Sequence, residues 1–191
     1  MSDVTIRIAN EADAASLCEI YAHYVLNTAV TFEYTPPNVH EFANRMKAIQ
    51  QSYPFLVCET GGRIAGYAYA APFNPRDAYL HSVEVTVYID KDFRRRGLAK
   101  RLYEQLEAIL FCMSVKNLYA CIAHTDTADE YLSLDSEMFH VHMGFKICGT
   151  FRNCGFKFGR WYSMVWAEKQ IASHEGNPAP FTTISQLATD S

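Results

Sequence analysis

A basic turn between an apolar run and an amphipathic segment is the feature of this sequence most suited to chemistry. The run Val85–Ile89 stops at Asp90, and Arg94–Arg96 leads through Gly97 into a stretch of leucines at helical spacing. Such a turn directs backbone N–H groups and the positive end of a helix dipole at one small volume, where a pyrophosphate fits. The sequence contains neither GxxxxGK[ST] nor GxGxxG, so the two commonest nucleotide-binding loops are excluded.

A carboxylate interrupts the strand that precedes this turn. Glu84 stands in an otherwise apolar run, so its side chain lies either in a cleft or on the solvated face of the sheet. An alkylamine is mostly ammonium near neutral pH, and it must lose a proton before it attacks a carbonyl carbon. Partial burial raises the pKa of a carboxyl toward the working pH, which suits a general base acting directly or through water.

Hydrophobic periodicity predicts the elements that position these residues. We expect about seven strands, at residues 4–8, 55–59, 64–71, 80–89, 118–123, 145–150 and 161–167. Helices are expected after Asn10, after the cap Asn38, from Gly97 to about Met113, and around Glu137–Met143. This order describes an α+β fold, with a mixed and mostly antiparallel sheet flanked by helices. The strands on either side of the Gly97 helix are expected to pair in parallel.

Length and composition predict one domain of ordinary globular character. The 191 residues are 49% apolar and 20% charged, and we expect a single domain over residues 1–168. Residues 169–191 are rich in Ser, Thr, Pro and Gly toward their end, which predicts a weakly ordered C-terminal extension. The net charge of −4 argues against nucleic acid as a partner. No apolar run approaches the ~18 residues of a membrane span, so no membrane partner is expected.

Cysteine usage and the N-terminus indicate the compartment. The six cysteines form no CxxC pair and several lie in apolar runs, which predicts reduced thiols in a cytoplasmic protein. The N-terminus has no basic segment followed by an apolar one, so no export signal is expected. Histidines and cysteines show no finger-like spacing, and we expect no metal site.

Four segments together resemble the GNAT acetyltransferase superfamily and, within it, the phosphinothricin and methionine-sulfoximine N-acetyltransferase group. The superfamily's coenzyme loop, Arg/Gln-x-x-Gly-x-Gly/Ala, is matched by Arg94-x-x-Gly97-x-Ala99. The group's other motifs are similar to residues 72–89, to Ser136-x-x-Phe139-His140-x-x-Met143-Gly144-Phe145 and to Gly155–Trp161. The resemblance covers about residues 4–166. One segment departs from the family, because residues 124–135 are longer and more acidic than its usual loop, and Ser133 is nearest to the customary asparagine.

The resemblance implies acetyl-CoA as the acyl donor and no metal. The pyrophosphate is expected at the amides of the basic turn, where Gly97 lets the backbone approach closely. The pantetheine arm is expected to pair with the preceding strand, with one N–H group polarising the thioester carbonyl. The residues so implied are Val87, Tyr88, Ile89, Arg94, Arg95, Arg96, Gly97, Leu98, Ala99 and Lys100.

The resemblance also implies two catalytic residues. It favours the cleft for Glu84, which is then predicted to be the general base. His140 stands where many relatives carry a tyrosine that protonates the departing thiolate, and the same role is predicted for it. Helical histidines are more often packing residues, so a structural role is the alternative. Cys121 and Cys148 have no histidine or basic neighbour, which argues against an acyl-enzyme.

The acceptor pocket is predicted from one loop arginine and several aromatic residues. A guanidinium binds a carboxylate through two hydrogen bonds, and aromatic walls exclude water. The alternatives are core packing for the aromatic residues and an exposed loop for the arginine. The candidates are Phe32, Tyr34, Arg76 and Tyr79, with Lys157 as a second cation for an anionic acceptor.

These expectations combine into one reading with open alternatives. The protein is expected to be an acetyl-CoA-dependent N-acetyltransferase that acts on the primary amine of a small, amino-acid-like molecule by direct attack in a ternary complex. One alternative acceptor is a protein or peptide amine, or a polyamine. Another alternative is a non-catalytic module that binds acyl-CoA. The resemblance further implies a homodimer.

Overall fold

The computed structural model describes residues 4–189, and it contains one seven-stranded sheet in the order β1-β2-β3-β4-β5-β7-β6. All neighbouring strands are antiparallel except β4 and β5, which are parallel. The predicted mixed sheet and its parallel pair are therefore confirmed. The strands are β1 (Val4–Ile8), β2 (Phe55–Thr60), β3 (Arg63–Pro72), β4 (Ser82–Ile89), β5 (Asn117–His124), β6 (Lys146–Lys157) and β7 (Arg160–Gln170).

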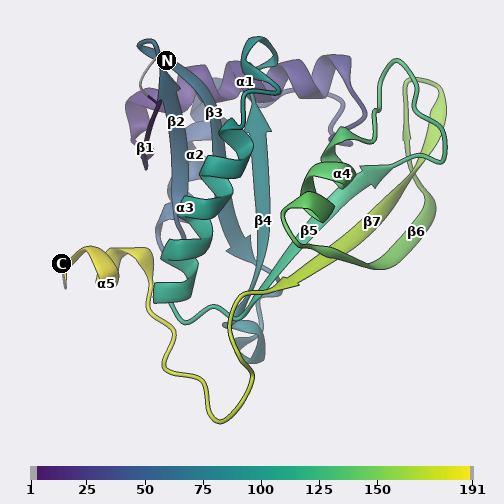
Figure 1. Cartoon of the computed structure of the whole chain (residues 1–191). Coiled ribbons are helices and arrows are strands. Elements are labelled where there is room, and N and C mark those ends of the chain that lie inside the picture. The colour runs from purple at the N-terminus through teal and green to yellow at the C-terminus, as the bar shows by residue number, and fades with distance from the viewer. Residues whose placement is uncertain (1–3, 190–191) are drawn as a thin grey trace.

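Helices cover both faces of the sheet (Figure 1). On one face lie α1 (Ala14–Asn27) and α2 (Val39–Gln50), and on the other lie α3 (Leu98–Cys112) and α4 (Asp135–His142). The chain also forms the short helix α5 (Ile184–Thr189) and the 3₁₀ turns η1 (Glu11–Asp13), η2 (Asp77–Tyr79) and η3 (Lys91–Phe93). No helix within residues 4–189 is long and apolar enough to cross a membrane.

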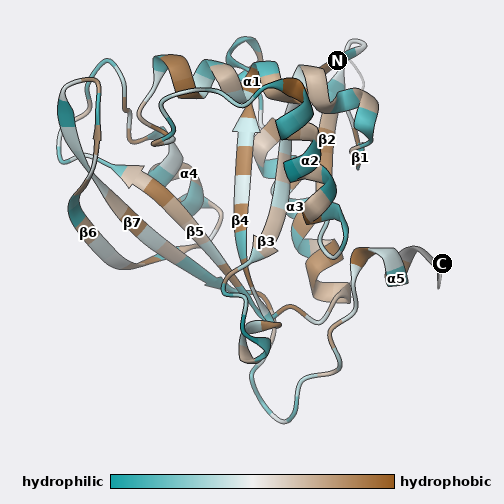
Figure 2. Ribbon diagram, turned by 180° about the vertical axis from the view of Figure 1, so that it is seen from behind, coloured by the Kyte–Doolittle hydropathy of each residue, from teal (hydrophilic) through white to brown (hydrophobic). Residues whose placement is uncertain are grey.

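Strand alternation divides the buried side chains into two main cores. Val83 and Val85 of β4 point toward α3, whose Leu102 is fully buried against them. Val57 and Tyr67, on β2 and β3, pack beneath α1 and α2 in the second core. Figure 2 shows the resulting brown, apolar stripes along the strands and along the inner sides of the helices.

The strands β4 and β5 pair over a very short length. Ser82–Glu84 is in register with Asn117–Tyr119, and beyond these residues β5 pairs only with β7. Figure 1 shows the two strands diverging from their shared lower end. The upper part of β4 therefore has a free edge on the side of β5, and a wedge opens there between the two halves of the sheet.

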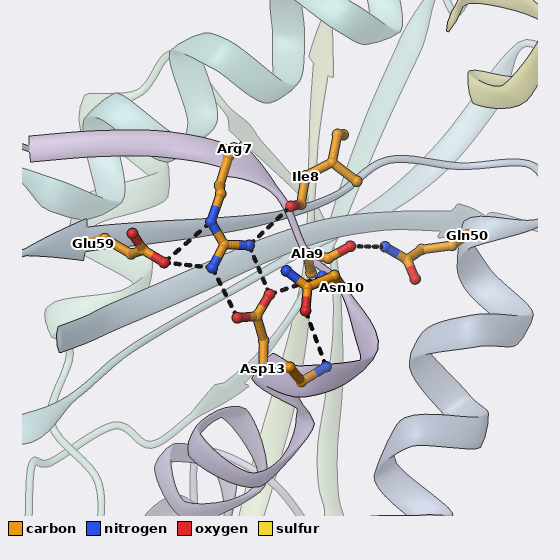
Figure 3. A network of polar contacts seen from close by, with 8 residues as sticks. Arg7, Ile8, Ala9, Asn10, Asp13, Gln50 and Glu59 are labelled. Atoms are coloured by element: carbon orange, nitrogen blue, oxygen red, sulfur yellow. Dashed lines mark hydrogen bonds and ion pairs between the residues drawn. The ribbon is translucent and has the colours of Figure 1, made fainter. Parts of the chain in front are cut away.

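A polar network joins the first strand to α1 (Figure 3). Arg7 donates to both carboxylate oxygens of Asp13, at 2.7 and 2.8 Å, and to Glu59 of β2. Asn10 caps the turn before α1, and its own backbone N–H donates to Asp13 at 2.8 Å. The hydrogen bonds from Arg7 hold the pKa of the buried Asp13 below its usual value. The network fixes the start of α1 on the sheet.

Several element boundaries differ from the sequence-based expectation, and two differences have an identifiable local cause. The strand expected to end near residue 150 continues as β6 to Lys157. The sequence does not predict this second half, because most of its side chains are exposed and the pairing with β7 shifts register at 147/149 and 151/155. The strand expected from Leu80 begins at Ser82, because the Leu80 N–H closes the η2 turn on Asp77 at 3.1 Å.

The segment after β7 packs on the α3 side of the sheet. The side chains of Ile171, Phe181 and Leu187 contact the core there, and the Ile184 N–H donates to the Ser52 carbonyl at 3.0 Å. The domain boundary predicted after residue 168 falls inside β7, which continues to Gln170. The weakly ordered extension over 169–191 stays a prediction, and residues 190–191, like the N-terminal residues 1–3, lie outside the described part of the chain.

Candidate active site

The basic turn joins β4 to α3 as the sequence predicts. Gly97 is the N-cap of α3 with φ 76°, and a Cβ placed on it would meet no atom within 4 Å. The first backbone N–H groups of α3, from Leu98 to Lys100, have no carbonyl partner inside the helix. They lie at the end of the turn that follows β4, next to the open space at Gly97. The turn therefore offers N–H donors and room for an anion.

Three exposed arginines lie in the turn before this helix, and each makes a different contact. The guanidinium of Arg94 lies 5.0 Å from the centre of the Tyr24 ring. Arg96 donates to the Asp92 carbonyl at 2.8 Å, and Arg95 pairs with Asp135 at the start of α4 across 3.4 Å. The resulting positive charge suits a polyphosphate, because guanidinium groups bind phosphate oxygens with strong charge-assisted hydrogen bonds.

A cavity of about 50 Å³ lies in the wedge between β4 and β5. Val87 and Tyr88 line it, whereas the Ile89 side chain is buried and its carbonyl accepts a hydrogen bond from Tyr24. Residues from α3, α4 and the loops on either side complete the wall. The whole lining is Val30, Val85, Thr86, Val87, Tyr88, Tyr103, Cys121, Ile122, Ala123, Leu132, Ser136 and His140.

A larger hollow, of about 580 Å³, lies over α1 and the β2–β3 turn. It is an open groove, and none of the residues predicted for the site lines it. Two of its carboxylates are already paired, Asp13 with Arg7 and Asp90 with Arg63. We place the site at the smaller cavity, because the free edge of β4 lies there together with the buried His140. Glu84 is adjacent in sequence to the lining residue Val85 and is not itself among the lining residues.

Glu84 lies on β4 at the point where the wedge opens. Its strand neighbours are Ala71 on β3 and Tyr119 on β5. The side chain is half-buried, and burial raises the pKa of its carboxyl above the ordinary value. Within residues 4–189 the carboxylate has no hydrogen-bond or ion-pair partner. A desolvated, unpaired carboxylate of this kind is well suited to accept a proton.

His140 is buried at the cavity wall with both ring nitrogens occupied. Nδ1 is 2.7 Å from the Ser136 carbonyl, and Nε2 is 3.0 Å from the hydroxyl of Tyr103 on α3. Burial lowers the pKa of His140 and raises that of Tyr103. Sequence reasoning did not single out Tyr103, although a tyrosine in the buried leucine stripe of α3 needs a partner for its hydroxyl.

Three of the predicted acceptor residues gather where the α1–α2 loop contacts β6. The Tyr34 hydroxyl donates to the Phe156 carbonyl, and Lys157 Nζ donates to the Thr31 carbonyl at 2.7 Å. Lys157 is buried, which lowers its pKa. Phe32 packs so closely on Gly155 that a Cβ there would lie 2.3 Å from its ring. These contacts dock the α1–α2 loop on β6, and none of the three residues lines the cavity.

The other two acceptor candidates lie at the opposite end of β4. The Arg76 guanidinium is exposed and has no protein partner among the described residues. Tyr79 lies 5.8 Å from Phe73, which stacks on Tyr119 at 4.2 Å. Within residues 4–189 no hydrogen bond, ion pair or ring contact joins this pair to Phe32, Tyr34 or Lys157. The structure therefore brings the five candidates together as two groups.

The acidic segment 124–135 is an ordered wall of the cavity. The Asp129 carboxylate accepts hydrogen bonds from the backbone N–H groups of Tyr131 and Leu132, from the Tyr162 hydroxyl, and from Arg160 at 2.9 Å. Leu132 lines the cavity, and the Tyr131 carbonyl accepts from Ala29 at 2.9 Å. The Asp129 carboxylate therefore stabilises the conformation of this loop.

Comparisons with known proteins point to one family. The acetyltransferase (GNAT) domain family matches residues 6–166. The chain is 32% identical to phosphinothricin N-acetyltransferase of Streptomyces viridochromogenes, over 96% of each chain. It is 30% identical to the L-methionine sulfoximine/L-methionine sulfone acetyltransferase of Salmonella typhimurium, over 90% of this chain and 96% of that one. The phosphinothricin acetyltransferase of Sinorhizobium meliloti, solved in complex with AcCoA, superposes with a TM-score of 0.85 at 31% identity, over 94% of each chain.

Proposed function

Since this chain belongs to the GNAT acetyltransferase family, we propose that it transfers the acetyl group of acetyl-CoA to the primary amine of a small, amino-acid-like molecule. The enzyme is an N-acetyltransferase, and the amine attacks the thioester directly within a ternary complex. Two of its relatives are named for phosphinothricin and for methionine sulfoximine, which are amino-acid analogues.

One observation carries the proposal. The free edge of β4 has the unpaired Glu84 carboxylate at the end where β4 leaves β5, and the turn into α3 at its other end. An extended arm fits along the strand edge, with a diphosphate at the N–H groups of Leu98, Ala99 and Lys100. The donor carbonyl then lies beside the backbone of Val87 and Tyr88, where an N–H group polarises it.

Glu84 is proposed as the general base. It takes the proton from the acceptor ammonium, so that the neutral amine can attack the carbonyl carbon. Val30 and Leu132, which come from two different loops, line the cavity and exclude water from the thioester. Cys121 is unsuited to be a nucleophile, because burial raises the pKa of its thiol to about 12.

The acceptor is proposed to enter from the face that carries Glu84. The free guanidinium of Arg76 is suited to bind a carboxylate of the acceptor, and Tyr79 with Phe73 forms an aromatic wall beside it. Lys157 adds positive charge at the far end near Phe32 and Tyr34. Two cations among the proposed acceptor residues favour an amino-acid-like acceptor over a polyamine, which both would repel.

We also propose that two copies pair through β6. This strand is an edge of the sheet, and Phe151 and Phe156 on it are 54% and 45% exposed. A second copy of the same edge would cover these side chains and supply backbone partners. We place the protein in the cytoplasm, which is supported by the six cysteines, all of them unpaired.

A thiol-release assay tests the proposed function. Purified protein is incubated with acetyl-CoA and each of a panel of acceptors: free amino acids, methionine sulfoximine, phosphinothricin, a basic peptide and spermidine. We expect saturable release of coenzyme A with one or more amino-acid-like amines. Turnover with the peptide or spermidine alone would refute the acceptor class. Coenzyme binding without turnover on any amine would refute the enzymatic reading.

A further inference from the structure

Tyr103 and His140 form a buried, neutral pair at the wall of the cavity. A backbone carbonyl only accepts hydrogen bonds, so His140 Nδ1 carries the ring's proton and donates it to Ser136. Nε2 therefore has a lone pair, and the hydrogen bond of 3.0 Å between the two side chains is donated by the Tyr103 hydroxyl. The single proton of neutral His140 is thus engaged by the Ser136 carbonyl, whereas the proton of Tyr103 lies between the two side chains.

We propose that Tyr103 protonates the sulfur that leaves the acetyl donor, and that His140 is the positioning residue that orients its hydroxyl. The inference rests on the proposed acetyl transfer. It assigns the proton to Tyr103 on α3, whereas the sequence pattern alone assigned it to His140 on α4.

The two faces of the sheet separate the acid from the base. Tyr103 and His140 belong to the helices on the α3 side, whereas Glu84 follows the alternation of β4 and faces the α1 side. The cavity passes between β4 and β5 and is lined from both sides. A thioester in the wedge therefore meets a base on the side of the incoming amine and a proton donor on the side of the leaving sulfur.

The proton count balances without any further reactant. Glu84 takes one proton from the acceptor ammonium, the C–N bond forms, and the C–S bond breaks with its electron pair going to sulfur. The Tyr103 proton goes to sulfur, and the nitrogen sheds its second excess proton to solvent. After the thiol departs, the phenolate regains a proton from solvent and Glu84 releases its proton to solvent, so that one proton is released in total and both side chains return to their starting states. The growing charge on sulfur makes it a better acceptor than Nε2, and the hydroxyl turns toward it.

Other proton-bearing groups at the cavity are weaker candidates. The Cys121 thiol already contacts Met164. Ser136 presents an aliphatic hydroxyl, which is a poorer acid than a phenol in the same surroundings. Among the cavity side chains, Tyr103 alone combines a phenol proton with a histidine that holds it in place.

Four variants test the proposal with acetyl-CoA and the acceptor found in the assay above. Tyr103→Phe keeps the ring and removes the proton, and we expect kcat to fall roughly 10²-fold while coenzyme A binding measured by calorimetry stays unchanged. The kcat of His140→Leu should fall to the same level, and the kcat of the double variant should be no lower than that of either single variant. His140→Gln places an amide oxygen near the position of Nε2, and it should recover most of the activity. Tyr53→Phe, another buried tyrosine, lies outside the cavity and should match the wild type.

Each contrary result has a distinct meaning. Full kcat in Tyr103→Phe overturns the proposal, and a loss in His140→Leu alone returns the proton donor to His140. If Tyr103→Phe loses as much affinity for coenzyme A as it loses kcat, Tyr103 has a packing role, and this result also overturns the proposal. If Tyr103→Phe does not fold, the two His140 variants test the proposal: a higher kcat in His140→Gln than in His140→Leu supports it, and an equally low kcat in both overturns it. A wild type without turnover refutes the proposed function, which is a different failure.

Discussion

The Tyr24 hydroxyl donates a hydrogen bond of 2.7 Å to the Ile89 carbonyl, and this bond joins α1 to the last residue of β4. The same ring lies beneath the Arg94 guanidinium at 5.0 Å. One buried side chain therefore fixes both the end of the strand and the first arginine of the basic turn. The position of the proposed phosphate site therefore depends on packing from α1.

Tyr24→Phe should separate these two effects. The change leaves the Ile89 carbonyl buried without its donor, and we expect a loss of about 1–3 kcal/mol in the free energy of unfolding. The ring is kept, so Arg94 retains its support and KM for acetyl-CoA should change little. Urea unfolding and steady-state kinetics measure the two quantities. A variant as stable as the wild type would mean that another donor reaches Ile89.

Gly97→Ala should weaken the binding of acetyl-CoA. A side chain at φ 76° costs about 1–2 kcal/mol in stability, and the new methyl projects into the open space expected to hold the diphosphate. We expect KM for acetyl-CoA to rise at least several-fold. Gly176→Ala is the matched control, because Gly176 has φ 72° and open space around it but lies after β7. It should lose similar stability and keep its KM, and a shared rise in KM would contradict the assignment.

Glu84→Gln should remove the general base. We expect kcat/KM to fall roughly 10²-fold or more. The wild-type profile should lose activity as pH falls through the raised pKa of this carboxyl, and the variant should lack that limb. Glu168→Gln on β7 is the control, because Glu168 is exposed, and its rate should match the wild type. Full activity of Glu84→Gln across pH would exclude the role.

The same substitution should stabilise the fold at neutral pH. A carboxyl whose pKa is raised on folding costs stability above that pKa, where the buried side chain must be charged. The free energy of unfolding of Glu84→Gln should therefore exceed that of the wild type near pH 7, and this difference should shrink as pH falls toward the ordinary carboxyl pKa. Thermal melts from acid to neutral pH check this. A variant less stable than the wild type at pH 7 would show that the charged form is favourably solvated.

Asp13→Asn should have the opposite dependence on pH. The pKa of Asp13 is lowered on folding, first by its hydrogen bonds from Arg7, so its contribution is present above the unfolded pKa. We expect a loss of roughly 1.5–3 kcal/mol near pH 7, measured by urea unfolding. The difference from the wild type should disappear as pH falls through the folded pKa. Glu11→Gln, an exposed change in the same turn, should have little effect at any pH.

The proposed pairing through β6 can be tested by measuring the molar mass of the protein in solution. Phe151→Asp places a charge on the exposed edge strand, and light scattering after gel filtration should show the wild type as a dimer and the variant as a monomer. Phe111→Asp is the matched control, because Phe111 is 60% exposed on α3, away from β6. It should remain a dimer. A monomeric wild type would refute the pairing.

Local patterns predicted the elements whose sequence signals are strong. The strand before Asp90, the glycine at the turn and the leucine stripe after it each have one dominant local cause, and α3 follows them closely. Asn38 caps α2 by accepting the Glu41 N–H at 2.9 Å, as its type and spacing indicate. Glu84 could be singled out because a carboxylate in an apolar strand requires an explanation.

Other features depend on contacts between distant segments, which no local pattern contains. The Tyr103–His140 hydrogen bond joins residues 37 positions apart, and only the packing of α4 against α3 brings them together. The docking of Tyr34 on β6 spans 122 positions. The second half of β6 was missed because most of its residues are exposed, so burial does not alternate as in a half-buried strand.

Only three residue pairs join β4 to β5, and their brevity has a mechanical consequence. One half of the sheet is built on β1–β4 and the other on β5–β7, and the two halves meet along this short seam while α3 packs on β2–β4. In the proposed complex, an extended acetyl donor at the free edge of β4 would lengthen the seam and bridge the two halves. Its binding would then stiffen the frame against which the acceptor is aligned.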